Sequence, residues 1–361
     1  MKIGFDHTIF LIQKYGGISR YFNEILKNLN KDTDVKICCP IHLNNLIDSK
    51  NKKVFEIKRI NSIPKFSTKL INKFNFYINN IIFKNWRPDI IHKTYFNDYN
   101  YKFLNAKIVV NVWDLSHEIY HNMYNMPKNW RPKESALKNV DHVICSSKKT
   151  QADLIKFYDF DFKKTSVVYQ SAPNLNKNFE INDKKDNILL FVGSRLKYKN
   201  FEKLLEAFSL KKEILYDFKL VCFGSEKVSD KEKFLIKKYN LNEKNIQFDF
   251  GSDEKLLNYY LNATALIYPS KNEGFGFPPL EAMTYGCPVI SSNNSAIIEA
   301  TGISKFTFDP DDPNDIINVL EKVISSKENQ IFLQNYGITR VKQFSAESMI
   351  KNLKKTYKML T

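Results

Sequence analysis

The sequence predicts an α/β protein made of two doubly wound, parallel-sheet domains that face a central cleft. Three observations predict this fold. The chain has 361 residues, which suits about two domains. Short apolar segments alternate with helical patterns along most of the chain, as in parallel sheets covered by helices. The alternation restarts after the polar stretch Asn174–Asn187, so we expect a first domain over residues 1–173 and a second over 174–345.

The expected strands are short and apolar, because a strand in a covered parallel sheet has no face toward solvent. In the first domain they are Lys2–Asp6, Val35–Pro40, Asp89–His92, Ile108–Trp113, His142–Ser146 and Ser166–Tyr169. In the second domain they are Ile188–Gly193, Lys219–Gly224, Ile246–Phe250, Ala265–Pro269 and Val289–Ser291. Residues 41–85, dense in Asn, Lys, Ile and Phe, show no clear pattern.

Beyond Phe308 the pattern becomes helical. We expect helices at Ile316–Ile324, Gln330–Gln343 and Ala346–Met359. Ser345 is the expected N-cap of the last helix, because a serine side chain there accepts a hydrogen bond from an unpaired N–H of the first turn.

The composition limits the partners. The formal net charge is +16, from 55 Lys and Arg against 39 Asp and Glu, so the surface attracts polyanions or an anionic membrane. The basic residues are scattered, as on an ordinary solvated surface. No nucleic-acid-binding motif accompanies them, and we expect no nucleic-acid partner.

The cysteines and the N-terminus indicate a cytoplasmic protein. The five cysteines are odd in number and none has metal-ligand spacing, so they are expected to be reduced core thiols. The N-terminus resembles a strand and lacks the apolar segment of a signal peptide. No apolar run approaches the roughly 18 residues of a membrane span. We therefore expect any membrane contact to be peripheral, at the cytoplasmic face.

The segment Glu273–Met283 carries the strongest functional signal. Gly274 and Gly276 let the backbone approach a ligand closely, and the backbone around Phe275 offers N–H donors. Two prolines then favour the start of a helix, whose N-terminus attracts a phosphate or a developing negative charge. Glu273 precedes this loop, and Glu281 lies in the first helical turn. Either glutamate alone is explained by solvation or by the helix dipole, but the whole segment predicts a site for sugar or ribose hydroxyls.

A second candidate anion site follows the first strand. Gly16 and Gly17 precede a helix expected over Ile18–Asn28, so a helix N-terminus lies beside a glycine pair. Ordinary turns use the same residues. Arg20, one turn into the helix, either contacts a phosphate or pairs with Glu24.

Arg195 and Lys199 form a third candidate site, in the loop after the first strand of the second domain. Ligands of open α/β sheets bind at the carboxyl ends of strands. The planar guanidinium of Arg195 and the ammonium of Lys199 are suited to neutralise a diphosphate as its bond to a sugar breaks. A basic loop without a ligand is the alternative.

Two metal-binding patterns are weighed against this interpretation. His117-Glu118-Ile119-Tyr120-His121 matches H-E-x-x-H, which on a helix binds zinc. It follows a strand of the α/β alternation and no third ligand helix comes after it, so we do not expect a zinc site. D-x-D tripeptides at 32–34, 159–161 and 309–311 are better explained as surface turns. We expect no metal and no cofactor.

Together these features resemble glycosyltransferase family 4, the retaining enzymes with the GT-B fold. The resemblance spans nearly the whole chain and is strongest over residues 254–312. Glu273–Met283 matches the family's E-x7-E signature, and Gly286–Ile290 and Ser295–Glu299 continue the match. The segments Gly16–Phe22 and Val192–Arg195 are similar to a subgroup that builds cell-surface polysaccharides such as O-antigen and capsule.

The resemblance implies a role for each candidate residue. Glu273 would bind hydroxyls of the donor sugar, and Glu281 the ribose of its nucleotide. Arg195 and Lys199 would hold the diphosphate, helped by backbone N–H groups at Gly17 and around Phe275. The remaining candidates are Phe250 and Gly251 beside the base, and Arg20, Asp114 and His117 on the acceptor side. The family often has a His-Asp pair where this chain has Trp113-Asp114.

The resemblance also implies a mechanism and an arrangement of the domains. The acceptor would attack on the face that the phosphate leaves, and the departing phosphate oxygen would take the acceptor's proton. Domain closure would bring Gly17 up to the diphosphate, and the last helix, 346–361, would pack back on the first domain. The expected donor is a nucleotide-diphosphate sugar and the expected acceptor a saccharide or lipid-linked saccharide. The alternatives are a GT-B sugar-nucleotide epimerase and a non-enzymatic polyanion-binding protein.

Overall fold

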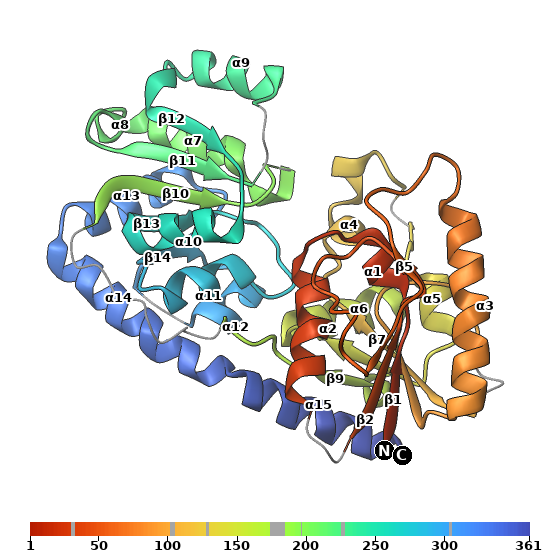
Figure 1. Cartoon of the computed structure of the whole chain (residues 1–361). Helices are drawn as coiled ribbons and strands as arrows, with labels where there is room; N and C mark the ends of the chain where they lie inside the picture. The colour runs from red at the N-terminus through yellow and green to blue at the C-terminus, as the bar shows by residue number, and fades with distance from the viewer. Residues whose placement is uncertain are drawn as a thin grey trace.

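The computed structural model describes residues 1–29, 33–101, 105–127, 130–173, 185–195, 197–224, 228–302 and 305–361. Within them the chain forms two α/β domains, each built on a parallel sheet, with the second domain above and to the left of the first in Figure 1. This confirms the predicted fold class. The predicted linker lies mainly outside the described residues, and its last two residues already belong to the first strand of the second sheet.

The first domain has a parallel sheet with the strand order β4-β2-β1-β6-β7-β8-β9. The order reverses between β1 and β6, which makes a switch point where loops diverge and leave room for a ligand. Its strands are β1 (Lys2–Phe5), β2 (Asp34–Cys38), β4 (Val54–Phe55), β6 (Ile90–Lys93), β7 (Lys107–Val112), β8 (His142–Cys145) and β9 (Thr165–Val167).

Helices cover this sheet, and a short parallel pair of strands, β3 (Ile41–His42) and β5 (Lys58–Arg59), lies beside it. The helices are α1 (Thr8–Ile12), α2 (Gly17–Asn28), α3 (Thr68–Trp86), α4 (Ser116–Ile119), α5 (Glu134–Lys138) and α6 (Lys148–Tyr158), with the 3₁₀ helices η2 (His121–Tyr124) and η3 (Phe162–Lys164). The segment 41–85, which had no readable pattern, contains β3, β4, β5 and most of α3.

The second domain has a parallel sheet with the order β12-β11-β10-β13-β14-β15, and its switch point lies between β10 and β13. Its strands are β10 (Asp186–Val192), β11 (Lys219–Phe223), β12 (Ile246–Asp249), β13 (Ala263–Tyr268), β14 (Val289–Ser292) and β15 (Thr307–Phe308). All eleven strands expected from the sequence are present within about two residues, which is the usual uncertainty of strand ends. The expectations missed β3, β4, β5 and β15, each of which has only two residues.

The helices of the second domain are η4 (Lys197–Lys199), α7 (Phe201–Leu210), α8 (Ile214–Asp217), α9 (Asp230–Lys238), η5 (Glu243–Asn245), α10 (Asp253–Asn262), α11 (Phe277–Thr284), α12 (Ser295–Thr301), α13 (Pro313–Ile324) and α14 (Lys327–Val341). They pack on both faces of the sheet. One apolar cluster lies between the sheet and α7 and α13, and a second lies between the sheet and α11. Among the described helices, none combines the length and the apolar character that a bilayer span requires.

The C-terminal helix leaves the second domain and packs on the first. After η6 (Lys342–Phe344), α15 (Ala346–Leu360) runs under the molecule and ends beside the N-terminus (Figure 1). Ser345 caps α15 by accepting from the N–H of Ser348, as expected. The Tyr357 side chain is fully buried in the first domain's core, where its hydroxyl lies 2.6 Å from Nδ1 of His92. This helix therefore ties the two domains together.

A second contact between the domains joins α12 to α6. The carboxylate of Glu299 accepts hydrogen bonds from the first two N–H groups of α6, those of Lys148 (2.7 Å) and Lys149 (2.8 Å). It also accepts one from the hydroxyl of Tyr169 (3.0 Å). A carboxylate at a helix N-terminus satisfies unpaired donors and complements the helix dipole. Glu299 therefore caps a helix of the other domain.

Candidate active site

The candidate site lies where the loops at the carboxyl ends of the two sheets meet. The loop after β13 contacts the loop after β8 directly, because the hydroxyl of Ser146 donates to the carbonyl oxygen of Gly274 at 2.8 Å. Close by, the amide of Asn272 donates to the hydroxyl of Ser116 at 3.0 Å. These buried contacts place the Glu273–Met283 segment against the first domain, at the edge where ligands of open α/β sheets bind.

Lys199, Glu273 and Tyr268 form a compact hydrogen-bonded group at the switch point of the second sheet. Nζ of Lys199 lies 2.5 Å from Oε1 of Glu273 and 3.1 Å from the hydroxyl of Tyr268. That hydroxyl donates to the same Oε1 at 2.8 Å. Lys199 extends from η4 after β10, and the other two residues belong to β13 and its loop. The two residues predicted from the sequence are therefore in contact, although 74 positions apart.

The environment keeps Lys199 charged. Its side chain is 12% exposed and that of Glu273 is 13% exposed. Burial alone lowers the pKa of an amine, but the acidic groups around Lys199, chiefly Glu273 with its charge and its hydrogen bond, together outweigh burial, and the pKa of Lys199 is raised above its usual value. A buried ammonium at this place can neutralise an anion that enters the site.

Arg195 has a different carboxylate partner. Its Nε donates to Glu232 on α9, and its Nη2 lies 3.4 Å from the second oxygen of the same carboxylate. The guanidinium also lies over the ring of Phe248, 4.6 Å from its centre. The side chain is only 4% exposed. Arg195 and Lys199 thus both follow β10 in the chain, but in this structure they pair with different carboxylates, those of Glu232 and Glu273.

Glu281 is buried in the second turn of α11, one turn later than the sequence suggested, because the helix begins at Phe277. Its Oε2 accepts from the hydroxyl of Tyr260 at 3.2 Å, and its Oε1 accepts from Nη1 of Arg20 at 3.2 Å. Burial raises the pKa of Glu281 to about 7, although the charge of Arg20 and the hydrogen bond from Tyr260 oppose the rise. A carboxyl group with such a pKa changes charge near neutral pH.

The structure decides against Glu24 as the partner of Arg20, whereas the phosphate contact stays a prediction. The sequence suggested a pair with Glu24 or a phosphate contact on the acceptor side. Glu24 instead accepts from the amide of Asn28 at 2.6 Å. Arg20 reaches across to the second domain, where it pairs with Glu281 and with Asp253 at the start of α10. Local spacing along α2 could not reveal partners more than two hundred residues away.

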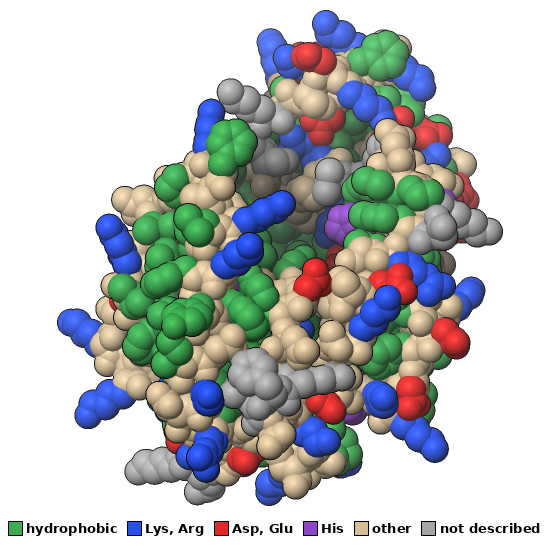
Figure 2. Space-filling view, turned by 90° about the vertical axis from the view of Figure 1, so that its right-hand side faces the viewer, with side chains coloured by type: hydrophobic (Ala, Val, Ile, Leu, Met, Phe, Trp, Pro, Cys, Tyr) green, Lys and Arg blue, Asp and Glu red, His purple; other side chains and the backbone are tan. Residues whose placement is uncertain are grey.

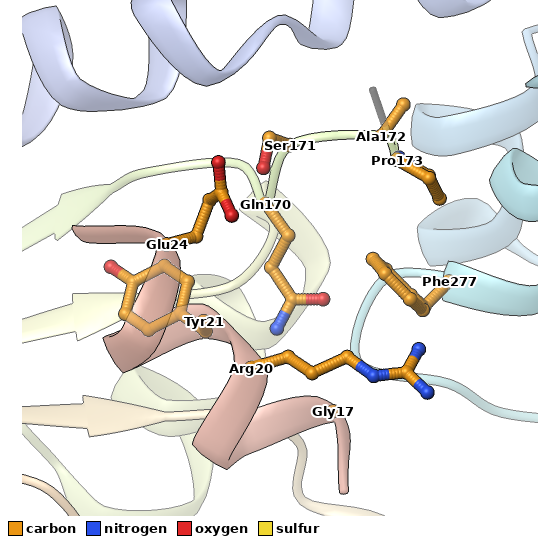
Figure 3. Close-up of a pocket in the computed structure, with 9 residues that line it drawn as sticks. All are labelled: Gly17, Arg20, Tyr21, Glu24, Gln170, Ser171, Ala172, Pro173 and Phe277. Carbon is orange, nitrogen blue, oxygen red and sulfur yellow. The ribbon is translucent and has the colours of Figure 1, made fainter. Parts of the chain in front are cut away.

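Figure 3 shows the side chain of Arg20 extending from α2 toward Phe277, the first residue of α11. Both residues line a cavity of about 120 Å³ between the domains. Gly17, Tyr21 and Glu24 form its floor on α2, and the segment 170–173 lines another side. Arg20, the partner of the candidate donor residue Glu281, therefore lines a cavity that both domains share.

Gly17 and Gly16 differ in what surrounds them. Gly17 is the first residue of α2, and a Cβ added to it would meet nothing within 4 Å. A Cβ on Gly16 would come within 2.4 Å of the side chain of Gln13, which accepts from the N–H of Ser19. Open space is therefore available at Gly17, whereas a side chain at Gly16 would require the end of the Gln13 side chain to shift.

Gly274 and Gly276, in the loop before α11, occupy positions where a side chain would clash or be strained. A Cβ on Gly274 would lie 1.7 Å from the carbonyl oxygen of Trp113, so only glycine permits this approach of the two domains. Gly276 precedes α11 with φ +107°, a conformation that side chains disfavour. Phe275 is buried and stacks on Tyr169, with 5.2 Å between ring centres. Its side chain has a packing role, which leaves only its backbone for a ligand.

Phe250 and Gly251 follow β12 and lead to Asp253, the partner of Arg20. The side chain of Phe250 is half exposed. Its backbone N–H donates to Asp249, whose carboxylate also pairs with Lys255 at 2.6 Å. The loop that was expected to hold the base is thus close to the Arg20–Glu281 contact.

Asp114 and His117 lie on the first-domain side of the site. Oδ1 of Asp114 accepts from the N–H of Ser116 at 2.9 Å. Burial raises the pKa of Tyr124, and the charge of Asp114 raises it further while that of Lys199 lowers it. Asp114 is therefore near both Tyr124 and the donor-side lysine. His117 is exposed and packs against Tyr124, with ring centres 4.7 Å apart.

The structure does not support the zinc interpretation of H-E-x-x-H. The segment is not one continuous helix, because α4 ends at Ile119 and η2 begins at His121. The carboxylate of Glu118 is buried in an ion pair with Lys133, at 2.5 Å. In the part of the chain that the structure describes, no cluster of three or more potential ligands could hold a metal ion.

Sequence reasoning missed several side chains of the site. Tyr268 is the last residue of β13, so its place at the carboxyl end of a strand was a usable signal. Tyr260 and Asp253 lie on α10 and carried no comparable signal. They join the site only because α10 packs beside α11.

Comparisons with known proteins agree with this geometry. A family model described as Glycosyltransferase Family 4 matches residues 15–171, and one described as Glycosyl transferases group 1 matches residues 174–340. The sucrose-phosphate synthase of Thermosynechococcus elongatus has a similar structure, with a TM-score of 0.74 and 18% identity over 100% of this chain and 99% of that one. The structure of Anabaena Alr3699/HepE in complex with UDP and glucose has a TM-score of 0.68 and 14% identity, covering 99% of both chains.

The chain is also similar in sequence to curated proteins. The O-antigen chain mannosyltransferase RfbU of Salmonella typhimurium is 30% identical over 178 residues, which are 49% of this chain and 49% of RfbU. A Campylobacter jejuni enzyme, N-acetylgalactosamine-N,N'-diacetylbacillosaminyl-diphospho-undecaprenol 4-alpha-N-acetylgalactosaminyltransferase, is 27% identical over 57% of this chain and 56% of its own length. The chain thus spans about half the length of these two curated relatives.

The two parallel-sheet domains, whose loops meet at the carboxyl edges of both sheets, define the GT-B fold class. The family models, which match most of both domains, identify the family. The chain belongs to glycosyltransferase family 4.

Proposed function

We propose that this glycosyltransferase moves a sugar from a nucleotide-diphosphate donor to a saccharide or lipid-linked saccharide, with retention of configuration, in cell-surface polysaccharide biosynthesis. The names of the relatives support the substrate class: RfbU is an O-antigen chain mannosyltransferase, and the Campylobacter enzyme acts on a sugar carried by diphospho-undecaprenol. A structural neighbour was solved in complex with UDP and glucose.

The observation that carries the proposal is the Lys199–Glu273–Tyr268 group, which faces the first domain at a sheet switch point. A cation and a carboxylate side by side can bind the two parts of an activated sugar, because the cation binds the diphosphate and the carboxylate accepts hydrogen bonds from the sugar hydroxyls. We assign the diphosphate to Lys199 and the sugar hydroxyls to Glu273. Tyr268 positions both groups, because its hydroxyl contacts each of them.

Arg195 is assigned to the same diphosphate, together with Lys199. Its guanidinium has five N–H donors, so it can keep its contact with Glu232 and still bind a phosphate oxygen. We also assign to the diphosphate the backbone N–H groups of Gly17 and of the residues around Phe275, which would donate hydrogen bonds to it. The proposal includes no metal ion.

Glu281 is assigned to the ribose. A carboxylate accepts hydrogen bonds from two adjacent hydroxyls, and this one is held at the entrance to α11 beside the Phe250–Gly251 loop. In this structure Arg20 occupies one of its oxygens. A bound ribose would therefore take the place of Arg20 or share Glu281 with it.

During transfer, the bond between the sugar's anomeric carbon and the phosphate oxygen breaks. A new bond forms on the same face, from the acceptor's hydroxyl oxygen to that carbon. The acceptor's proton goes to the departing phosphate oxygen, so the protein mainly positions the reactants and stabilises charge. We place the acceptor beside Asp114 and His117, on the first-domain side of Lys199.

The test is a thermal-shift titration of the purified chain with UDP, GDP and ADP, because a ligand that binds only the folded form raises the melting temperature with concentration. The matching nucleotide sugars are then incubated with and without saccharide acceptors, and the products are identified. Transfer that needs an acceptor supports the proposal. An epimerised sugar from donor alone would replace it with an epimerase, and salt-sensitive polyanion binding without nucleotide affinity would favour a binding protein.

A further inference from the structure

Helix α3 of the first domain carries apolar side chains on its exposed face as well as on its buried face. A surface helix normally buries its apolar stripe and exposes its polar face. In α3 the fully buried residues include Asn75 and Asn79, whereas Leu70 is 71% exposed and Tyr77 is 64% exposed. Phe74 (41%) and Ile81 (43%) are exposed as well. Burial in the fold therefore does not explain the exposed apolar face of this helix.

The exposed apolar residues form one continuous stripe. Leu70, Phe74, Tyr77 and Ile81 are spaced by four, three and four positions. At 3.6 residues per turn they fall within about 60° of one another around the helix. Just before the helix, Phe66 is 100% exposed and has φ +65°, an uncommon conformation for a bulky residue. We call these five side chains the α3 stripe.

The inner face of α3 is firmly attached, so the stripe has a fixed orientation. The amide of Asn75 exchanges two hydrogen bonds with the backbone of Ile41, at 2.9 and 2.8 Å. The side chain of Asn79 lies 3.1 Å from Nδ1 of His7, just after β1. Phe83 is completely buried. The helix therefore cannot turn its exposed apolar face inward without breaking buried hydrogen bonds.

Positive charge borders the α3 stripe. Between Lys58 and Pro88 there is no Asp or Glu in the sequence. All seven basic residues of this segment are exposed, and within the described part of the chain none of them forms an ion pair with a carboxylate. They are Lys58, Arg59, Lys65, Lys69, Lys73, Lys84 and Arg87. Figure 2 views the side of the molecule that carries α3 and shows gathered hydrophobic side chains with Lys and Arg side chains around them.

We propose that the α3 stripe and its basic border dock the first domain onto an anionic lipid bilayer. A helix with aromatic and aliphatic residues on one face and lysines beside it is the arrangement that lies in a membrane interface. The apolar side chains enter the boundary between headgroups and acyl chains, and the lysines contact the lipid phosphates. Charge complementarity selects this partner, because a second copy of the chain would oppose one basic border to another.

The inner face of α3 contacts His7, just after β1, so docking through the outer face of the helix leaves these buried contacts in place. The inference concerns the lipid surface alone and does not depend on which sugar or acceptor the enzyme uses.

The experiment is co-sedimentation of the full chain with vesicles of phosphatidylcholine, with or without about one-third phosphatidylglycerol. We expect binding to the anionic vesicles only. The variant Leu70→Ser/Tyr77→Ser should bind about tenfold more weakly or worse, because two buried apolar side chains are lost. Lys69→Gln/Lys73→Gln keeps the stripe and should weaken binding about fivefold per charge removed.

The matched control is Tyr216→Ser/Phe234→Ser, which removes side chains of the second domain with the same exposures, 71% and 64%. It should bind like the wild type. The melting temperature of each variant shows that it folds. Three results would overturn the proposal: no binding to anionic vesicles, equal loss in the control, or a dimer in light scattering that Leu70→Ser/Tyr77→Ser dissociates.

Discussion

Nη1 of Arg20 in the first domain donates a hydrogen bond to Oε1 of Glu281 in the second, at 3.2 Å, although 261 positions separate the two residues in the chain. The contact joins α2 to the Glu273–Met283 segment. It also occupies the carboxylate that we assign to the ribose. Domain contact and donor binding are therefore linked at one side chain.

The pKa of Glu281 leads to a prediction about stability. Its folded-state pKa is raised to about 7 from an ordinary value of 4.5. The stability that this carboxyl contributes is present below pH 4.5 and is lost as the pH rises through 7. We expect the wild type to lose up to roughly 3 kcal/mol relative to Glu281→Gln between pH 4.5 and 8, measured by urea unfolding. Glu321→Gln, on the surface, should follow the wild-type profile, and a Glu281→Gln profile parallel to the wild type would refute the prediction.

Lys199→Ala should lower kcat by about 10² to 10³-fold, because a preorganised cation facing the diphosphate is lost. Lys199→Arg should recover part of this loss. The matched control is Lys203→Ala, which removes a surface partner of Glu206. Steady-state kinetics with the donor found by thermal shift measures the effect. If Lys199→Ala retained full kcat while folded, the assignment of Lys199 to the diphosphate would be wrong.

Gly17→Ala separates ligand binding from folding. The added methyl group meets nothing within 4 Å in the ligand-free protein, so its melting temperature should stay within a degree or so of the wild type. If the diphosphate approaches Gly17, the same methyl group should raise the dissociation constant for the nucleoside diphosphate about tenfold. Calorimetry measures the constant. Unchanged affinity would remove Gly17 from the donor site.

Gly274→Ala should act on the domain contact. Its Cβ would lie 1.7 Å from the carbonyl oxygen of Trp113, so the loop or the first domain must move. We expect a drop of about 10²-fold in kcat/KM, as small displacements of reacting groups cost this much. Circular dichroism should show normal secondary structure. Wild-type kinetics for this variant would contradict the close approach of Gly274 to Trp113.

Glu299→Gln tests the tie between α12 and α6. The amide keeps one acceptor oxygen but loses the charge that caps α6. Hydrogen bonds to a charged group contribute about 1.5 to 3 kcal/mol, so the domains should separate more readily. Small-angle scattering should show a larger radius of gyration. Glu321→Gln is again the control, and an unchanged radius would show that the contact does not hold the domains together.

The local pattern determined the order of strands and helices. Parallel strands that are buried on both faces have to be apolar, so their positions were readable within about two residues. The two-residue strands β3, β4, β5 and β15 are too short to show a pattern. Helix α3 was missed for a different reason, because apolar residues lie on both its exposed and its buried face, and the buried face also contains asparagines, so no clear periodicity results.

The sequence by itself determined the two-sheet architecture, the glycine-containing loop before α11, and the residue types at the carboxyl ends of β10 and β13. Only the tertiary structure decided the partners: Lys199 with Glu273, Arg195 with Glu232, and Arg20 with Glu281. The physical reason is that these ion pairs are charge contacts between distant segments, and their geometry is set by how two sheets twist and pack. Side-chain periodicity records which face of an element is buried, but it does not record which distant charge lies opposite.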